Sequence, residues 1–157
     1  MGRSTRATKA LEQAGAAFSV HTYDYDPGAD RVGLQAAEAL GERPERVLKT
    51  LMLLVDGKPA CAIVASNSEV SLKRLAASLR AKGATMMKPA DAERVSEYKV
   101  GGISPFGQTR LTGIVVDASA MEHDLVFING GQRGLQVRLN PGAAVGVLGA
   151  TVATIRA

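Results

Sequence analysis

The chain has 157 residues, of which 46% are hydrophobic and 22% charged, so it can bury the core of one ordinary domain without metal ions or disulfides. This balance excludes a disordered chain, a collagen-like chain and a histone-like polyelectrolyte. A formal net charge of +4 and a pI near 9.5 favour a polyanionic partner, but aromatic residues at 4% with no Trp disfavour stacking a long single strand.

The first third of the sequence predicts a helix, a strand and two further short helices. The N-terminal helix has alanine and leucine at the three-and-four spacing of one face and stops at Gly15. A strand rich in β-formers follows over 18–23 and ends in an acidic turn. An alanine-rich helix over 34–40 precedes a brief helix that begins at Pro44.

The centre of the sequence predicts a buried hairpin. Residues 47–55 are nearly all apolar, which is typical of a strand covered on both faces. Asp56-Gly57 is a strong two-residue hairpin signal, and it leads into a second strand over 60–65.

A helix, a second helix and a glycine-rich loop are expected next. Ser71 is a plausible N-cap for a helix with one apolar face, and Gly83 is expected to cap the C-terminus of that helix. Pro89 fits the first turn of the second helix. A loop over 101–107 then leads into a strand over 111–117.

The last third predicts a pair of strands and a final strand. The strands over 125–129 and 135–139 are joined by a glycine-rich run. Gln136 and Arg138 alternate with apolar residues, so we expect them on a solvent-exposed face. Asn-Pro-Gly then breaks the chain before a short segment and a final strand over 152–155.

These elements predict the fold class. Helices interspersed with hairpin-type strands indicate α+β, with a mixed, mostly antiparallel, barrel-like sheet and surrounding helices. We find no internal repeat and no linker, and we expect residues 1–157 to form a single compact domain.

Cysteine usage and the N-terminus predict the compartment. A single cysteine cannot form an intramolecular disulfide, and with two histidines the chain lacks a four-ligand zinc set. No stretch approaches about 18 apolar residues, and the basic N-terminus is not followed by an apolar segment and cleavage site. We expect a cytoplasmic protein with no metal, no cofactor and no membrane contact.

The familiar catalytic signatures are absent. Cys61 lies among small apolar residues, so we interpret it as a buried hydrophobe rather than a nucleophile. His21 and His123 have acidic neighbours but no metal-binding spacing, so a His-carboxylate site stays open.

Glycines and one lysine are the more informative features. The run 101–107 lacks the lysine and serine of a phosphate-binding loop. Its glycines either bring backbone N–H groups close to a ligand oxygen or form a wide turn. Residues 129–131 are interpreted as a turn. Lys49 is bracketed by apolar residues, so its ammonium either reaches the surface or points into a pocket.

Four strings in this order resemble the YbaK family, the free-standing relatives of the editing domain inserted in bacterial prolyl-tRNA synthetases. The resemblance runs from about residue 8 to residue 155. The strings are His21-Thr22-Tyr23-Asp24, Val47-Leu48-Lys49-Thr50-Leu51, Gly101-Gly102-Ile103-Ser104-Pro105-Phe106-Gly107 and Asn129-Gly130-Gly131-Gln132-Arg133-Gly134.

The resemblance implies a trans-editing aminoacyl-tRNA deacylase with a compact α+β fold and no metal. The implied substrate is a mischarged tRNA(Pro), first Cys-tRNA(Pro), whose own thiol attacks its ester and leaves as a thiolactone. Such an enzyme, a lyase or hydrolase of an ester bond, contributes position and electrostatics. The implied partners are the acceptor end of aminoacyl-tRNA and prolyl-tRNA synthetase, with no role for DNA.

The resemblance also assigns roles to residues. Lys49 would hold the terminal adenosine or the ester, beside Tyr23 of the pocket, while Gly101 would donate its backbone N–H to the developing oxyanion. Thr50 and Gly102 would bind the same ligand. Ser104 and Gly130 belong to the same strings and are also expected to bind substrate.

Two departures leave the amino acid open. Asn129 stands where many relatives have serine, and Val32 stands where some have an aromatic residue. Both positions are expected to shape the pocket, so alanyl-tRNA(Pro) is an alternative substrate. Two further alternatives are a non-catalytic module that binds tRNA or a synthetase, and a hydrolase that activates water with His21 or His123.

Overall fold

The computed structural model describes residues 4–27 and 32–157, without the side chains of residues 32 and 33. The α-helices are α1 Arg6–Gln13, α2 Val32–Leu40, α3 Leu72–Ser78, α4 Pro89–Ser96 and α5 Pro141–Leu148, and the 3-10 helices are η1 Pro44–Arg46 and η2 Ala118–Glu122. The strands are β1 Ser19–Thr22, β2 Leu48–Val55, β3 Lys58–Ala65, β4 Ala84–Met86, β5 Gly113–Asp117, β6 Val126–Gln132, β7 Leu135–Leu139 and β8 Thr151–Ala153.

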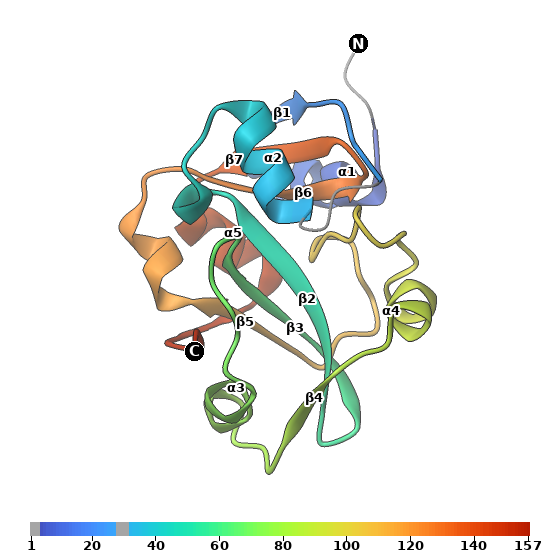
Figure 1. Ribbon diagram of the computed structural model, residues 1–157, viewed down its shortest axis with the longest axis vertical. Helices are drawn as coiled ribbons and strands as arrows, with labels where there is room; N and C mark the ends of the chain where they lie inside the picture. The colour runs from blue at the N-terminus through green and yellow to red at the C-terminus, as the bar shows by residue number, and fades with distance from the viewer. Residues whose placement is uncertain (1–3, 28–31) are drawn as a thin grey trace.

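The strands form two sheets, which confirms the α+β prediction. One sheet has the order β1-β7-β6 and the other the order β4-β2-β3-β5-β8, and only the β3–β5 and β5–β8 pairs are parallel. The sheets meet at one parallel bridge between Val47 and Phe127 and do not close into a barrel. In Figure 1 the three-stranded sheet lies at the top with α2 across it, and the longer sheet runs below between α3 and α4.

The central hairpin has the predicted turn. Asp56 and Gly57 both have positive φ, 49° and 77°, as a two-residue turn that matches the strand twist requires. The pairing runs without a bulge from Val55↔Lys58 to Leu48↔Ala65. Because this hairpin lies at the centre of the longer sheet, its register positions β2 relative to everything else.

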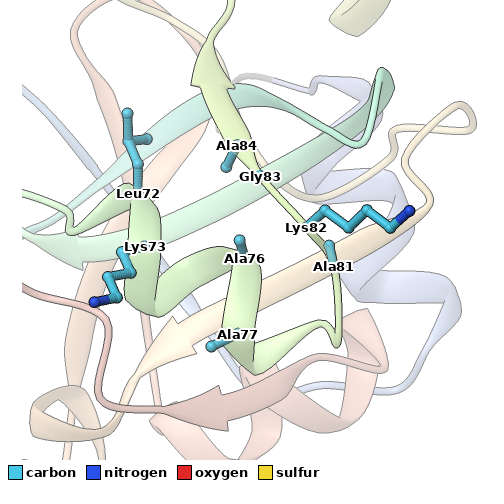
Figure 2. Close-up of a pocket in the computed structure, with 8 residues that line it drawn as sticks. All are labelled: Leu72, Lys73, Ala76, Ala77, Ala81, Lys82, Gly83 and Ala84. Carbon is cyan, nitrogen blue, oxygen red and sulfur yellow. The ribbon is translucent and has the colours of Figure 1, made fainter.

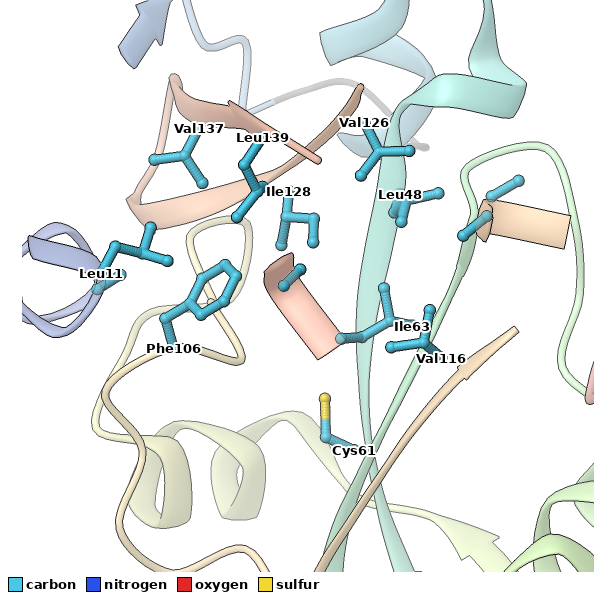
Figure 3. Close-up of a cluster of buried hydrophobic side chains, with 14 of the residues drawn as sticks. Leu11, Leu48, Cys61, Ile63, Phe106, Val116, Val126, Ile128, Val137 and Leu139 are labelled. Atoms are coloured by element: carbon cyan, nitrogen blue, oxygen red, sulfur yellow. The ribbon is translucent and has the colours of Figure 1, made fainter. Parts of the chain in front are cut away.

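The main core lies between the sheets. It is built from apolar residues of β2, β3 and β5 on one side and of β6, β7, α1 and the 101–107 loop on the other. Figure 3 shows Leu11 and Phe106 at one end of this cluster and Ile63 and Val116 at the other. Cys61 belongs to the same cluster and is fully buried, which confirms its interpretation as a core residue.

Gly83 does not cap α3, so that prediction is wrong. The helix ends at Leu79, and the left-handed residue after it is Arg80, with φ 56°. Gly83 instead exchanges hydrogen bonds with Asp56: its N–H donates to Oδ1 at 3.0 Å and its carbonyl accepts from the Asp56 N–H at 3.0 Å. These bonds start the unpredicted strand β4 on the edge of β2.

The segment after Asn140 is a helix rather than an unstructured break. The Asn140 side chain accepts from the Ala143 N–H at 3.1 Å, and Pro141 occupies the first turn of α5. Asn before Pro is therefore a helix start here, because Pro loses nothing at a position whose N–H has no helical partner.

A buried carboxylate anchors the C-terminal segment. Asp117 is 1% exposed, and its Oδ1 accepts from the N–H groups of Ile155 and Arg156, at 2.9 and 3.2 Å. Its Oδ2 accepts from the N–H and the hydroxyl of Ser119. Burial raises the pKa of Asp117, but these hydrogen bonds outweigh burial and hold the pKa below its usual range.

Asp117→Asn should lower the free energy of unfolding at pH 7 by about 1–3 kcal/mol, because it weakens charge-assisted hydrogen bonds to buried donors. A lowered pKa in the folded state stabilises the protein above the ordinary Asp pKa of about 3.9, and that contribution is lost as pH falls. Urea unfolding from pH 7 to pH 3 should therefore show wild type and variant converging in acid. The exposed Asp124→Asn serves as control, and equal losses in both variants would contradict the assignment.

Candidate functional site

A cavity of about 240 Å³ lies where the two sheets separate. It is lined by the first half of β2, by β6 and β7, and by the loop before β5: Leu48, Lys49, Thr50, Leu51, Val100, Gly101, Ile103, Asn129 and Gln136. The structure thus brings together Lys49, Thr50, Gly101 and Asn129, which the sequence predicted from three separate stretches of chain.

The cavity exists because one edge of β2 is only half paired. β3 pairs with β2 along its whole length, whereas β4 pairs only with Leu53–Val55. Ser66 donates its N–H to the Val47 carbonyl, so antiparallel alternation turns the backbone N–H and C=O of Thr50 toward the opposite, open edge. The half-paired edge therefore presents both backbone and side-chain polar groups to the cavity.

Lys49 brings a positive charge that the protein leaves unpaired. It is half-buried, and its ammonium makes no hydrogen bond and no ion pair within residues 4–27 and 32–157. A half-buried ammonium without a carboxylate is suited to an anionic or strongly polarised ligand.

Unsatisfied polar atoms also gather here. Four buried side-chain N or O atoms in the described part of the chain lack a hydrogen-bond partner, and three of them belong to Tyr23, Thr50 and Gln136. Leaving such a group unpaired costs about 1–3 kcal/mol. Because the Tyr23 hydroxyl and the Gln136 side chain face each other, the Thr50 hydroxyl is the atom that most clearly calls for a ligand.

Gln136 was predicted on a solvent-exposed face, and that prediction is wrong. It is 4% exposed and lies in the central strand β7, between His21 on β1 and Asn129 on β6. The predicted alternation of polar and apolar residues along this strand was right. The polar face opposite the core is covered by α2 and β2, however, and so becomes the cavity wall. A single strand's pattern does not show what covers its polar face.

Tyr23 stands behind the cavity lining. It is not itself a lining residue, but its hydroxyl faces Gln136. Burial raises the pKa of Tyr23, with a smaller opposing effect from Gln136, so the hydroxyl is a neutral donor.

Gly101 has the predicted free backbone donor, but Gly102 does not. Gly101 has φ 91°, its carbonyl accepts from Asn129 Nδ2 at 3.2 Å, and its N–H has no partner among the described residues. Gly102 donates its N–H to the Lys99 carbonyl at 2.8 Å, closing a turn. Only one of the two expected donors is therefore available to a substrate.

Two other predicted site residues, Ser104 and Gly130, do not line the cavity. The Ser104 hydroxyl accepts from the Phe106 N–H at 3.2 Å and serves the loop itself. Gly130 faces the core, where an added Cβ would come 2.0 Å from Leu135 Cδ2. Val32 begins α2, but its side chain lies outside the described residues.

The histidines and the cysteine lie elsewhere. His21 bonds Ser19 Oγ at 2.8 Å and packs on Phe127, and burial, with the nearby Arg138 charge, lowers its pKa. His123 lies in a separate polar hollow beside η2. Burial raises the pKa of Cys61 to about 12, which rules out a thiolate nucleophile at neutral pH.

A larger hollow of about 370 Å³ lies between α3 and β4 (Figure 2). Its wall is mostly alanine, and Lys73 and Lys82 extend toward opposite sides of it. None of the site residues predicted from the sequence lies there, and it holds none of the unsatisfied buried atoms of the described residues. We therefore place the candidate site between the sheets.

The family model for the aminoacyl-tRNA editing domain matches residues 26–145, which is more than half of the chain. The chain belongs to the aminoacyl-tRNA editing domain family. The matched segment contains the whole cavity lining, from Leu48 to Gln136.

Relatives of this editing domain include free-standing and synthetase-borne proteins. A protein of Enterococcus faecalis named "Putative Cys-tRNA(Pro)/Cys-tRNA(Cys) deacylase EbsC" is 27% identical over 155 residues, covering 98% of this chain and 93% of its own. A Streptococcus suis proline–tRNA ligase is 28% identical over 88 residues, covering 56% of this chain and 14% of the ligase.

A solved structure titled "Crystal structure of a putative trans-editing enzyme for prolyl tRNA synthetase" has the same fold as this editing domain. The TM-score is 0.83, with 21% identity and 99% of both chains covered. No helix in the described residues is long and apolar enough to cross a membrane.

Thr50→Val should raise the free energy of unfolding of the editing domain by up to about 1 kcal/mol, because it removes a buried hydroxyl that has no partner. The matched control is Thr8→Val. Thr8 is 2% exposed, and its hydroxyl accepts from the Thr5 N–H at 2.8 Å, so its loss should destabilise by about 1 kcal/mol. Urea unfolding measures both, and destabilisation by Thr50→Val equal to that of Thr8→Val would show that the Thr50 hydroxyl serves the fold.

Proposed function

We propose that this editing domain is an aminoacyl-tRNA deacylase that clears mischarged tRNA(Pro), with Cys-tRNA(Pro) as its first substrate. The observation that carries the proposal is a small cavity with an unpaired cation and an unsatisfied hydroxyl but no Cys, Ser, His, Asp or Glu among its described lining residues. The name of the Enterococcus faecalis relative supports the same substrate class.

The chemistry suits a substrate that carries its own nucleophile. The cysteinyl thiol attacks the ester carbonyl carbon, a C–S bond forms, and the C–O bond to the ribose breaks. The thiol proton ends on the departing ribose oxygen, so the products are a cyclic thiolactone and tRNA with a free hydroxyl. The protein's part is to hold the ester and thiol in an attacking geometry.

Two groups are suited to stabilise that reaction. The free N–H of Gly101 would donate to the carbonyl oxygen as it becomes negative, and the Lys49 ammonium would add its charge from β2. Thr50 and Gln136 would fix the rest of the acyl end through hydrogen bonds, and Tyr23, behind the lining, would orient Gln136.

Purified protein should release cysteine from Cys-tRNA(Pro) and leave Ala-tRNA(Pro), Ser-tRNA(Pro) and Pro-tRNA(Pro) intact, because only cysteine carries the attacking thiol. Ester loss is followed with radiolabelled amino acids. Rapid alanine release would instead support the alanyl-tRNA(Pro) alternative and would require an activated water. Salt-sensitive tRNA binding with no change in any ester lifetime would contradict deacylation and leave a binding module.

Lys49→Ala should reduce turnover of Cys-tRNA(Pro) at least a hundredfold without loss of stability, because the Lys49 ammonium has no partner in the part of the chain that the structure describes. The control is Lys58→Ala, which removes an exposed cation from the far end of the same hairpin. Equal activity of the two variants would refute the role of Lys49.

The proposal extends to partner and compartment. Similarity to a segment of a proline–tRNA ligase supports association with prolyl-tRNA synthetase. A tRNA substrate supports the inference that the activity is cytoplasmic. Co-purification with the synthetase and fractionation of the native protein test these two points.

A further inference from the structure

An arginine guanidinium lies over a tyrosine ring beside the cavity mouth. The Arg133 Cζ lies 5.4 Å from the centre of the Tyr25 ring, and Arg133 Nε donates to the Val100 carbonyl at 2.8 Å. Val100 and the adjacent Gly101 are cavity-lining residues. Arg133 and Tyr25 therefore lie at the rim of the site, and neither residue was assigned a role from the sequence.

The neighbouring glycines are what allow this pair to sit at the rim. A Cβ at Gly101 would come 2.5 Å from the Tyr25 hydroxyl, and a Cβ at Gly102 would come 2.7 Å from the backbone N of Arg133. Any side chain at either position would push the tyrosine or the arginine turn away from the loop. Gly101 and Gly102 thus leave room for Tyr25 and Arg133 at the rim, and Gly101 also supplies the free N–H donor.

The guanidinium is oriented but not neutralised. Arg133 is exposed, and no carboxylate of the described residues pairs with it. Its Nε bond and the ring beneath it fix the plane, which reduces the entropy that a ligand would otherwise cost to order it. Tyr25 lies on one side of the guanidinium, and Arg133 is exposed among the described residues, so its other side is available to a ligand.

The cavity is too small to hold a whole acylated nucleoside. At about 240 Å³ it lies below the range of about 300–1,000 Å³ typical of sites for drug-sized ligands. If the acyl group and ribose occupy the cavity, as the proposed function requires, the base must lie outside against the rim. Arginine guanidinium planes and aromatic rings are the groups on which unpaired RNA bases stack.

We propose that Arg133, backed by Tyr25, is the platform on which the 3′-terminal base of the acylated RNA stacks. This proposal rests on the proposed function for the identity of the ligand. The base, the guanidinium and the tyrosine ring form a three-layer stack, and the ribose is thereby placed over Gly101 with its ester inside the cavity.

The test compares Arg133→Met with wild type on two acylated RNA minihelices, one ending in adenosine and one ending in the same ribose without its base. On the adenosine substrate the variant should raise KM about tenfold and change kcat less than twofold. On the abasic substrate wild type and variant should have the same KM. Arg133→Lys should recover little, because a point charge does not replace a plane.

Arg138→Met is the matched control, since Arg138 also lies over a ring, 5.9 Å from the centre of Phe127, but away from the cavity rim. It should leave KM unchanged on both substrates. An equal KM increase on both substrates for Arg133→Met, or full recovery by Arg133→Lys, would overturn the platform in favour of loop support or a phosphate contact.

A binding measurement separates this proposal from the proposed function. The same two RNAs, carrying cysteine through a non-cleavable amide, are titrated in fluorescence anisotropy. Absence of ester cleavage by wild type would end the deacylase proposal, whereas an adenosine-dependent affinity that Arg133→Met removes would still support the platform. Equal affinities of wild type and Arg133→Met for the adenosine-ended RNA would overturn it.

Discussion

The site depends on one strand edge that is left half paired. β2 is fixed in register by β3 along its whole length, yet on its other edge β4 covers only the last three residues. The bridge between Val47 and Phe127 joins the second sheet to the start of β2 and no further. The two sheets therefore separate just beyond the bridge, and the space between them is walled by strands whose positions the core fixes.

Buried polar groups have hydrogen-bond partners in the C-terminal part of the fold but lack them at the site. Asp117 is buried with partners for both oxygens, so its charge holds the C-terminal segment in place. Around the cavity, Thr50 and Gln136 are buried without partners, and Lys49 has no counter-ion among the described residues. The paired carboxylate of Asp117 thus stabilises the fold, whereas the polar groups without partners lie where a ligand would bond them.

Local sequence patterns predicted most helices and strands, because these elements depend on residues that are close together in the chain. The Asp56-Gly57 turn needs positive φ at two adjacent residues, and the pattern of Leu135, Gln136 and Val137 shows a two-faced strand. The pattern could not show contacts between segments that are distant in the chain. These contacts decide which surface covers Gln136 and that Gly83 bonds Asp56 rather than capping a helix. They also leave the Gly102 N–H already bonded. The resemblance grouped Lys49, Thr50, Gly101 and Asn129, which line one cavity, but it also included Ser104 and Gly130, whose contacts are internal.

The central claim is that the gap beside β2 receives the acylated end of the RNA. Backbone amide NMR during titration with a short CCA-ended RNA, bearing cysteine through a non-cleavable amide, tests it without requiring turnover. The account predicts the largest shifts at Thr50, Gly101 and Gln136 and none in the alanine-walled hollow between α3 and β4. Shifts confined to that hollow, with the residues beside β2 unmoved, would contradict it.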